Sequence, residues 1–337
     1  MSLVALFGEF FASLTLISIS GYVLTGQLER LGARLHFTPG LLGVVVALGA
    51  DSPEIAAAIS ALARGHAEVS TGVVLGSNIF NVACLLGVSA IVAKNGLVVG
   101  RAGLQLGGGV ALLVTLLAAL LIAGWAPAGL VFVIVLLILL PYVVLSSLHE
   151  ARIRRWPLPT RIRDFLCDVV ATTELSSDSR PGSTTDEGSR FDWLALVPAL
   201  AAIVGSSVFM VDSATALGDY WRAPGAVIGV LVLATLTGIP NLISAIRLAS
   251  QGRSTAVVSE TLNSNSLNVV FGLCLPAVIF ATPSPNVIAL VALVFLSGLT
   301  LLGLILTGRS GGLRRTGGVA LLGLYAAFVV TVVELSR

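Results

Sequence analysis

The chain has 337 residues, of which 56% are hydrophobic and only 11% are charged. A soluble domain carries about 25% charged residues, so the composition excludes this class of protein. The formal net charge of +2 is small, and the basic residues form no stripe of the kind that binds nucleic acid. The composition therefore predicts an integral membrane protein whose surface meets lipid.

Ten apolar runs approach or exceed the roughly 20 residues that cross a bilayer as a helix. Helices are expected because backbone groups in lipid must be hydrogen-bonded within their own segment. A transmembrane β-barrel would show short alternating strands instead. The sequence thus predicts an all-α membrane protein with about ten transmembrane helices, at 3–24, 39–64, 68–94, 103–124, 128–149, 193–216, 224–250, 254–282, 285–307 and 315–336.

The polar segments predict how the chain is oriented. Residues 150–192 form the one long polar segment, whose second half, from Ser176 to Ser189, has the composition of a flexible linker. With the N-terminus outside, the inside segments carry most of the 19 basic residues, namely Arg30, Arg34, Lys94, Arg101, Arg152, Arg154, Arg155, Arg161, Arg163, Arg180, Arg190, Arg253, Arg309, Arg314 and Arg315. The positive-inside rule therefore predicts a multi-pass protein of the plasma (inner) membrane, with the loop cytoplasmic and both termini outside.

This loop leaves five spans on each side, in residues 1–149 and 193–337. An odd number of spans places the second half in the opposite orientation to the first. Transporters built in this way bind their substrate near the membrane midplane, where the two repeats meet. The predicted fold is therefore two inverted five-helix repeats joined by a cytoplasmic loop at 150–192.

Two short motifs occur in both halves. The first half has Ala-Leu-Gly-Ala-Asp-Ser-Pro-Glu at 47–54 and Gly-Ser-Asn-Ile-Phe-Asn at 76–81. The second half has Ala-Thr-Leu-Thr-Gly-Ile-Pro-Asn at 234–241 and Asn-Ser-Asn-Ser-Leu-Asn at 263–268. One offset of 187 residues aligns both pairs, as an internal duplication predicts.

The motifs place polar groups at membrane depth. A proline in mid-span is expected to break each helix and to free backbone carbonyls, which are tolerated only where they line a cavity or bind a cation. Asp51 and Glu54 add two carboxylates that are costly in lipid unless a cation or proton compensates them. Ser77 and Asn81 share one helix face, as do their counterparts in the second half. Hard cations prefer these oxygen ligands, so the pattern predicts a cation site.

These segments resemble the two α-repeats of the sodium/calcium exchanger (Ca²⁺:cation antiporter) superfamily. The usual form there is a Gly-Thr-Ser-x-Pro-Glu turn followed by a Gly-Ser-Asn-x-x-Asn helix, and the resemblance covers essentially the whole chain. It implies transported cations as ligands, with no cofactor, held by side chains of Asp51, Glu54, Ser77, Asn81, Asn241, Ser264 and Asn268 and by backbone carbonyls of Ala50 and Thr237. The family usually has Ser at position 51, Glu at position 241 and commonly Asp at position 268.

The predicted function is secondary active antiport of Ca²⁺, or a similar divalent cation, against Na⁺ or H⁺ by alternating access. Two alternatives remain open: a cation/proton antiporter without Ca²⁺ specificity, and a passive cation channel. No ATP-binding motif is present, which excludes a primary pump, and no nucleophile–base pair indicates an enzyme. With Asp51 and Glu54 ionised and amides in the second repeat, the site holds a charge of about −2, which predicts electroneutral exchange.

Several neighbouring residues have structural interpretations. Gly72 and Gly76 form a small-residue pair typical of close helix packing. The asparagines at 78, 263 and 265 are expected to be packing or interhelical hydrogen-bond residues, not ligands. Asp51 has the alternative role of a helix cap. Glu260, one turn before Ser264, is predicted either at the inner mouth of the pathway or as an interfacial carboxylate.

Overall fold

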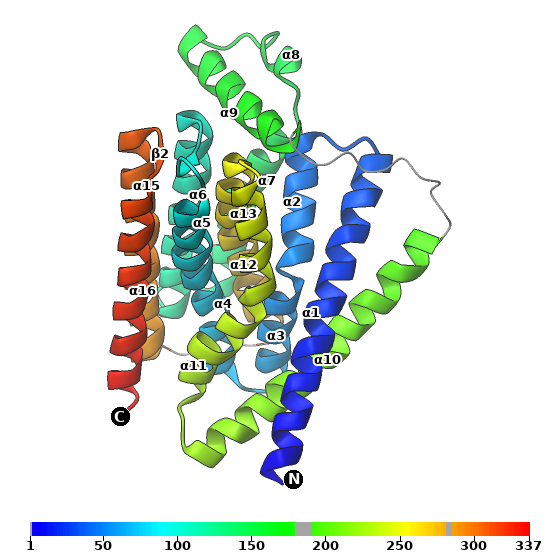
Figure 1. Ribbon diagram of the computed structural model, residues 1–337, viewed down its shortest axis with the longest axis vertical. Coiled ribbons are helices and arrows are strands. Elements are labelled where there is room, and N and C mark those ends of the chain that lie inside the picture. Colours follow the sequence, from blue (N-terminus) through cyan, green and yellow to red (C-terminus); the bar gives the residue numbers. More distant parts are fainter. Residues whose placement is uncertain (1, 179–190, 281–284) are drawn as a thin grey trace.

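The computed structural model describes residues 2–178, 191–280 and 285–337. Within these ranges nine helices are long and apolar enough to cross a membrane, and one bent helix pair provides a tenth span. Figure 1 shows these helices as a bundle of long, roughly aligned rods, with one pair crossing obliquely at its edge. The prediction of an all-helical protein with about ten spans is confirmed.

The first half contains five spans, several of them segmented. They are α1 (Leu3–Arg34), α2 (Pro39–Ala50) with α3 (Ser52–Ala63), α4 (Ala67–Phe80) with the π-helix η1 (Asn81–Leu85) and α5 (Leu86–Val92), α6 (Arg101–Ile122) and α7 (Ala128–Ser146). The first span is thus about ten residues longer than predicted, because the amphipathic stretch after Leu24 continues the helix.

The second half repeats this plan. Its spans are α10 (Phe191–Trp221), α11 (Gly225–Val227) with the π-helix η2 (Ile228–Leu233) and α12 (Ala234–Ser250), α13 (Ser254–Leu267) with the π-helix η3 (Asn268–Cys274) and α14 (Leu275–Ile279), α15 (Val287–Ser310) and α16 (Arg315–Leu335). The short strands β1 (Leu97–Val98) and β2 (Gly312–Leu313) pair antiparallel and join the two halves.

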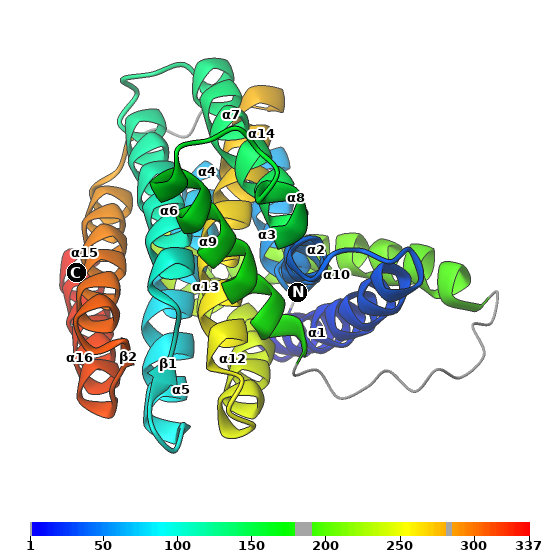
Figure 2. The same ribbon diagram turned by 90° about the horizontal axis from the view of Figure 1, so that it is seen from above.

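Two helices of the central polar segment, α8 (Glu150–Ile153) and α9 (Thr160–Asp178), lie at one end of the bundle, and both chain termini lie at the other (Figure 1). We call these ends the α9 face and the terminal face. Seen from above, α9 runs across the bundle (Figure 2), and it packs against α2, α6 and α13. Helix α9 includes the first three residues of the predicted flexible linker, and residues 179–189 lie outside the described ranges.

Close backbone contact joins the two halves where α4 crosses η2. A Cβ atom on Gly72 would lie 2.8 Å from the carbonyl oxygen of Ala226, and one on Gly76 would lie 2.5 Å from that of Val230. Both distances are too short for any side chain, so the helices reach this separation only with glycine. The predicted packing role of Gly72 and Gly76 is confirmed.

The two motif prolines have different effects. The first repeat breaks at Asp51, where α2 and α3 meet at an angle of 53°. In the second repeat α12 continues through Pro240, so the predicted break there is wrong. The irregularity of this span lies about two turns earlier, in the π-helix η2.

Candidate cation site

The break between α2 and α3 carries the two acidic residues of the first motif. Asp51 and Glu54 are 0% and 1% exposed, so both carboxyl groups are fully enclosed by protein. Pro53 has no N–H group to donate to the carbonyl of Gly49, and the hydroxyl of Ser52 donates to that carbonyl instead, at 2.7 Å. The local sequence therefore stabilises the bend that carries the two acids into the core.

Residues of the second repeat bind these two acids directly. The Ser264 hydroxyl on α13 donates to Asp51 Oδ1 at 2.9 Å. The amide of Asn241 on α12 lies 3.4 Å from Asp51 Oδ1 and 3.4 Å from Glu54 Oε1. Asp51 occupies the N-cap position of α3, as the alternative prediction had it, but its side chain makes no capping hydrogen bond there. The structure brings four of the predicted residues together.

Equivalent positions of the two repeats meet at this point. Glu54 and Asn241 are 187 residues apart, which is the offset of the duplication, and they hydrogen-bond to each other. Asn78 and Asn265 have the same separation, and the Asn78 amide donates to the Asn265 carbonyl at 3.1 Å. Equivalent positions can touch only close to the axis that relates two repeats. The site therefore lies at the centre of the molecule, between its halves.

The second motif of each repeat adds hydroxyl and amide groups. Ser77 and Asn81 lie fully buried on the span that packs between α3 and α12. Asn81 begins η1 and its counterpart Asn268 begins η3, so each helix widens at the equivalent residue. The Asn268 amide donates to Asn78 Oδ1 at 3.2 Å. Asn78 was predicted as a packing or interhelical hydrogen-bond residue, and its counterpart at the 187 offset also indicated a place near the axis.

Several buried oxygen atoms around this centre have no hydrogen-bond partner in the described part of the chain. They are Asp51 Oδ2, Glu54 Oε2, Ser77 Oγ, Asn81 Oδ1 and Asn268 Oδ1. Buried polar atoms without partners are costly and rare, so such a group indicates a bound species. The described residues contain no group of three or more His, Cys, Asp or Glu side chains able to hold a metal ion. Two carboxylates with neutral hydroxyl and amide oxygens instead suit a hard cation.

The two predicted carbonyl ligands lie beside this centre. Ala50 is the last residue of α2, next to Asp51, and Thr237 lies on α12 four residues before Asn241. The Thr237 hydroxyl donates to the carbonyl of Leu233 on its own helix at 2.8 Å, so its side chain is already engaged. The role of the two carbonyls stays a prediction.

The other predicted asparagines link helices. The Asn263 side chain accepts from the hydroxyl of Tyr142 on α7 at 2.9 Å. The Asn265 amide lies 3.4 Å from the Thr115 hydroxyl on α6. With the bond from Asn78, these contacts confirm the predicted interhelical role of the three residues.

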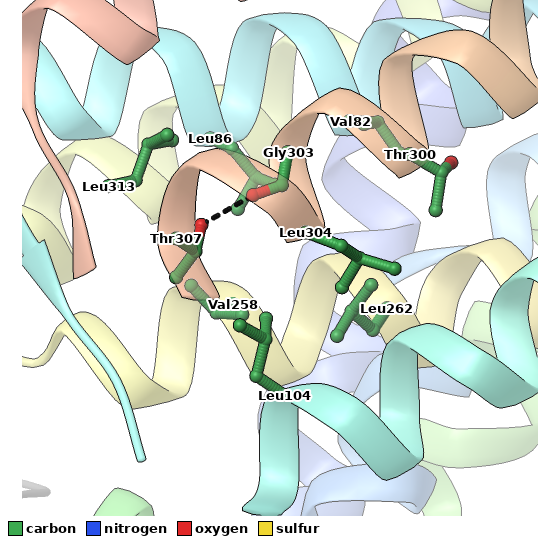
Figure 3. A pocket seen from close by; sticks show the side chains of 10 residues that line it. All are labelled: Val82, Leu86, Leu104, Val258, Leu262, Thr300, Gly303, Leu304, Thr307 and Leu313. Atoms are coloured by element: carbon green, nitrogen blue, oxygen red, sulfur yellow. Dashed lines mark hydrogen bonds between the residues drawn. The ribbon is translucent and has the colours of Figure 1, made fainter. Parts of the chain in front are cut away.

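A small pocket elsewhere in the bundle has a different character. Figure 3 shows it between η1, α6, α13 and α15, lined mainly by aliphatic side chains such as Leu104, Leu262 and Leu304. The hydroxyl of Thr307, which borders it, donates to the carbonyl of Gly303 at 2.7 Å, and that of Thr300 donates to Leu296. This pocket therefore offers a cation no free ligands.

Known proteins resemble large parts of the chain. The inner membrane protein YrbG of Escherichia coli K12 is 25% identical over 244 residues, covering 72% of this chain and 70% of YrbG. The sodium/calcium exchanger MaX1 of Methanosarcina acetivorans is 29% identical over 150 residues, covering 41% of this chain and 40% of MaX1.

A structure of the sodium-calcium exchanger NCX_Mj soaked with 10 mM Na⁺ and 10 mM Sr²⁺ has the same fold. It matches with a TM-score of 0.62 at 22% identity, and the match covers 98% of this chain and 99% of NCX_Mj. The profile of the sodium/calcium exchanger protein family matches residues 5–156 and 191–334, which leaves little more than the polar linker and the chain ends unmatched. This chain of two repeated halves is therefore a membrane cation antiporter, not an enzyme, and belongs to the sodium/calcium exchanger family.

Proposed function

We propose that the chain exchanges a divalent cation, Ca²⁺ or a similar ion, against Na⁺ or H⁺ by alternating access. The observation that carries the proposal is the set of unpartnered buried oxygens around Asp51 and Glu54, at the meeting point of the two repeats. A site on this axis can face either side of the membrane as the repeats rock against each other. The similarity to MaX1, which is named a sodium/calcium exchanger, supports the same ion pair.

The test is the substitution Glu54→Gln, which keeps the size of the side chain and removes its charge. We expect Ca²⁺ uptake into proteoliposomes to fall to background, because the site then loses one of its two carboxylates. Glu68→Gln is the matched control, since Glu68 is exposed on the terminal face and its loss should leave uptake unchanged. Normal uptake by the Glu54→Gln protein, with correct folding, would remove Glu54 from the site.

The exchanged ions are identified by flux in the same vesicles. We expect uptake of Ca²⁺ to require an opposing gradient of Na⁺ or H⁺, whereas a channel would conduct without one. Screening Na⁺, K⁺, H⁺ and Mn²⁺ as alternatives separates Ca²⁺ exchange from a less selective cation/proton antiporter. Clamping the membrane potential tests the electroneutral scheme. If each cycle moves one net charge across the membrane, the driving free energy changes by about 2.3 kcal/mol per 100 mV, and the flux then depends on the potential.

We further propose that the α9 face is cytoplasmic and that the termini lie outside. The support is the cluster of arginines in the central segment on that face, such as Arg155 and Arg161. Cysteine labelling tests this orientation, because the native cysteines Cys84, Cys167 and Cys274 are buried. An Arg155→Cys protein should react only from inside intact cells, and a Trp125→Cys protein only from outside. The reverse pattern would invert the topology.

A further inference from the structure

A network of three asparagines joins the two repeats beside the central acids. The amide nitrogen of Asn78 donates to the backbone carbonyl of Asn265 at 3.1 Å, and Asn78 Oδ1 accepts from the amide nitrogen of Asn268 at 3.2 Å. All three residues are buried. Asn78 is not among the predicted cation ligands, so its central place in this asparagine network calls for its own explanation.

The asparagine network fixes which end of each amide points where. A backbone carbonyl only accepts hydrogen bonds, so Asn78 must turn its nitrogen to Asn265 and its oxygen to Asn268. Asn268 must then turn its own nitrogen to Asn78, which leaves its oxygen at the opposite end of the amide. That oxygen is buried and has no hydrogen-bond partner among the described residues. Asn78 therefore dictates the orientation of Asn268.

Asn268 lies on the helix face that meets the acids. It follows Ser264 by four residues, and residues four apart share a helix face. On this face Ser264 donates to Asp51 at 2.9 Å. A hard cation binds the oxygen end of an amide and is repelled by the NH₂ end, so the orientation of Asn268 decides whether this residue acts as a ligand.

The equivalent bond is not formed in the other direction. It would join the Asn81 amide to Asn265 Oδ1, but both amide atoms of Asn81 and this oxygen are without a partner in the described part of the chain. Asn265 turns its nitrogen instead to the hydroxyl of Thr115 on α6, at 3.4 Å. The position equivalent to Thr115 is Leu302 on α15, whose side chain offers Asn78 no hydrogen bond. This exchange of threonine for leucine leaves Asn78 available to Asn268.

We propose that Asn78 is a positioning residue of the cation site, which holds the side-chain oxygen of Asn268 toward the bound ion. The inference rests on the proposed function, because it assigns one neutral ligand of that site and the residue that orients it. Asn78 does not bind the ion itself, since both ends of its amide are engaged. Residues that orient a metal ligand in this way typically contribute about tenfold or more to the affinity for the metal.

The experiment combines Asn78→Leu with Asn268→Asp and measures equilibrium binding of Ca²⁺ to the purified full chain. Asn78→Leu keeps a side chain of similar size and removes both hydrogen bonds, so binding should weaken by about tenfold. A carboxylate presents an oxygen whichever way it turns. In the Asn268→Asp background, Asn78→Leu should therefore no longer weaken binding, whereas a merely structural role of Asn78 would cost the same in both backgrounds.

Asn265→Leu is the matched control. Asn265 is the equivalent residue of the second repeat and is equally buried, but the asparagine network uses its backbone carbonyl, which the substitution keeps. This variant loses the bond to Thr115, so its midpoint of thermal unfolding should fall while its Ca²⁺ affinity stays close to that of the wild type. Should Asn78→Leu not fold, the smaller Asn78→Ser, which cannot bridge both partners, replaces it.

The two proposals fail in different ways. Ca²⁺ binding that is equal in the wild type and in the Asn78 variant, or absent from the wild type, would overturn the positioning role. An equal loss of affinity in the two backgrounds would also overturn it, because Asn78 would then act through packing alone. If binding depends on Asn78 only while residue 268 is an amide, but no counter-ion drives uptake, the positioning role stands and antiport is the proposal that fails.

Discussion

Two equivalent helix crossings of the duplicated fold have diverged. Toward the terminal face, α4 crosses η2 with Gly72, Gly76 and Gly229 at the contact, and backbone touches backbone. Toward the α9 face, α13 packs against α2, and the positions equivalent to those glycines are Ser259, Asn263 and Leu42. This second crossing carries Glu260 and the bond from Ser264 to Asp51, and α9 covers it.

The difference shows how one duplicated motif can give the two sides of a pathway different properties. Glycines that bring two backbones into contact leave no room for water or an ion between α4 and η2. On the α9 side, the contact between α13 and α2 is made through side chains, and the separate helix α9 covers it. We therefore expect the glycine crossing to govern stability and the carboxylate crossing to govern ion affinity.

The largest effect is expected from Gly76→Leu. A side chain at this position would meet the Val230 carbonyl and the Ala234 side chain, so α4 and η2 must separate. Overpacking of a core costs about 1–3 kcal/mol, and two clashing backbones place this variant at the upper end. Thermal unfolding in detergent should show a large fall in the midpoint temperature together with loss of Ca²⁺ uptake.

The control for this variant is Gly109→Leu. Gly109 lies on α6 with nothing within 4 Å of its would-be Cβ atom, so the same substitution meets no neighbour. Its midpoint temperature should stay close to that of the wild type. Equal midpoints for the two variants would show that the glycine crossing does not hold the halves together.

A smaller effect, confined to ion preference, is expected from Asp51→Ser. This variant tests the crossing of α13 with α2 on the α9 side. This change removes the acceptor of the Ser264 hydroxyl and one of the two charges on which the site depends. Competition between Na⁺ and Ca²⁺ for uptake should shift against Ca²⁺ by about tenfold, while the midpoint of unfolding changes little.

The control Ser52→Ala alters the bend between α2 and α3 without removing a charge, so it distinguishes the effect of the bend from the effect of the Asp51 carboxylate. Its hydroxyl satisfies the Gly49 carbonyl, so its loss should lower stability by about 1 kcal/mol and leave ion preference unchanged. If Asp51→Ser also left ion preference unchanged, Asp51 would be structural and the carboxylate crossing would have no part in selectivity.

The smallest effect is expected from Arg64→Ala. Arg64 pairs with Asp212 at 3.0 Å and joins α3 to α10 near the terminal face, but both side chains are more than a third exposed. Exposed pairs contribute about 0–1 kcal/mol. The midpoint of unfolding should therefore hardly change, and a fall as large as that of Gly76→Leu would mean that this ion pair, not the glycine contact, secures the terminal side.

The sequence by itself determined the spans and the two halves, and it predicted which residues form the site. Hydropathy over about 20 residues is a local property, and it located all ten spans because lipid forces each backbone to satisfy its own hydrogen bonds. The constant offset of 187 residues identified Glu54, Asn241 and their neighbours as equivalent positions, and equivalent positions of an inverted repeat meet at its axis.

Only the tertiary structure decided how these residues are used. The α12 helix continues through Pro240, and the irregular η2 segment lies about two turns earlier, which no local pattern predicts. The Asn241 amide reaches both Asp51 and Glu54, and Asn78 holds Asn268, across contacts that join residues nearly 190 positions apart. Such contacts depend on which helices cross and at which residue, and the packing of the whole chain fixes that.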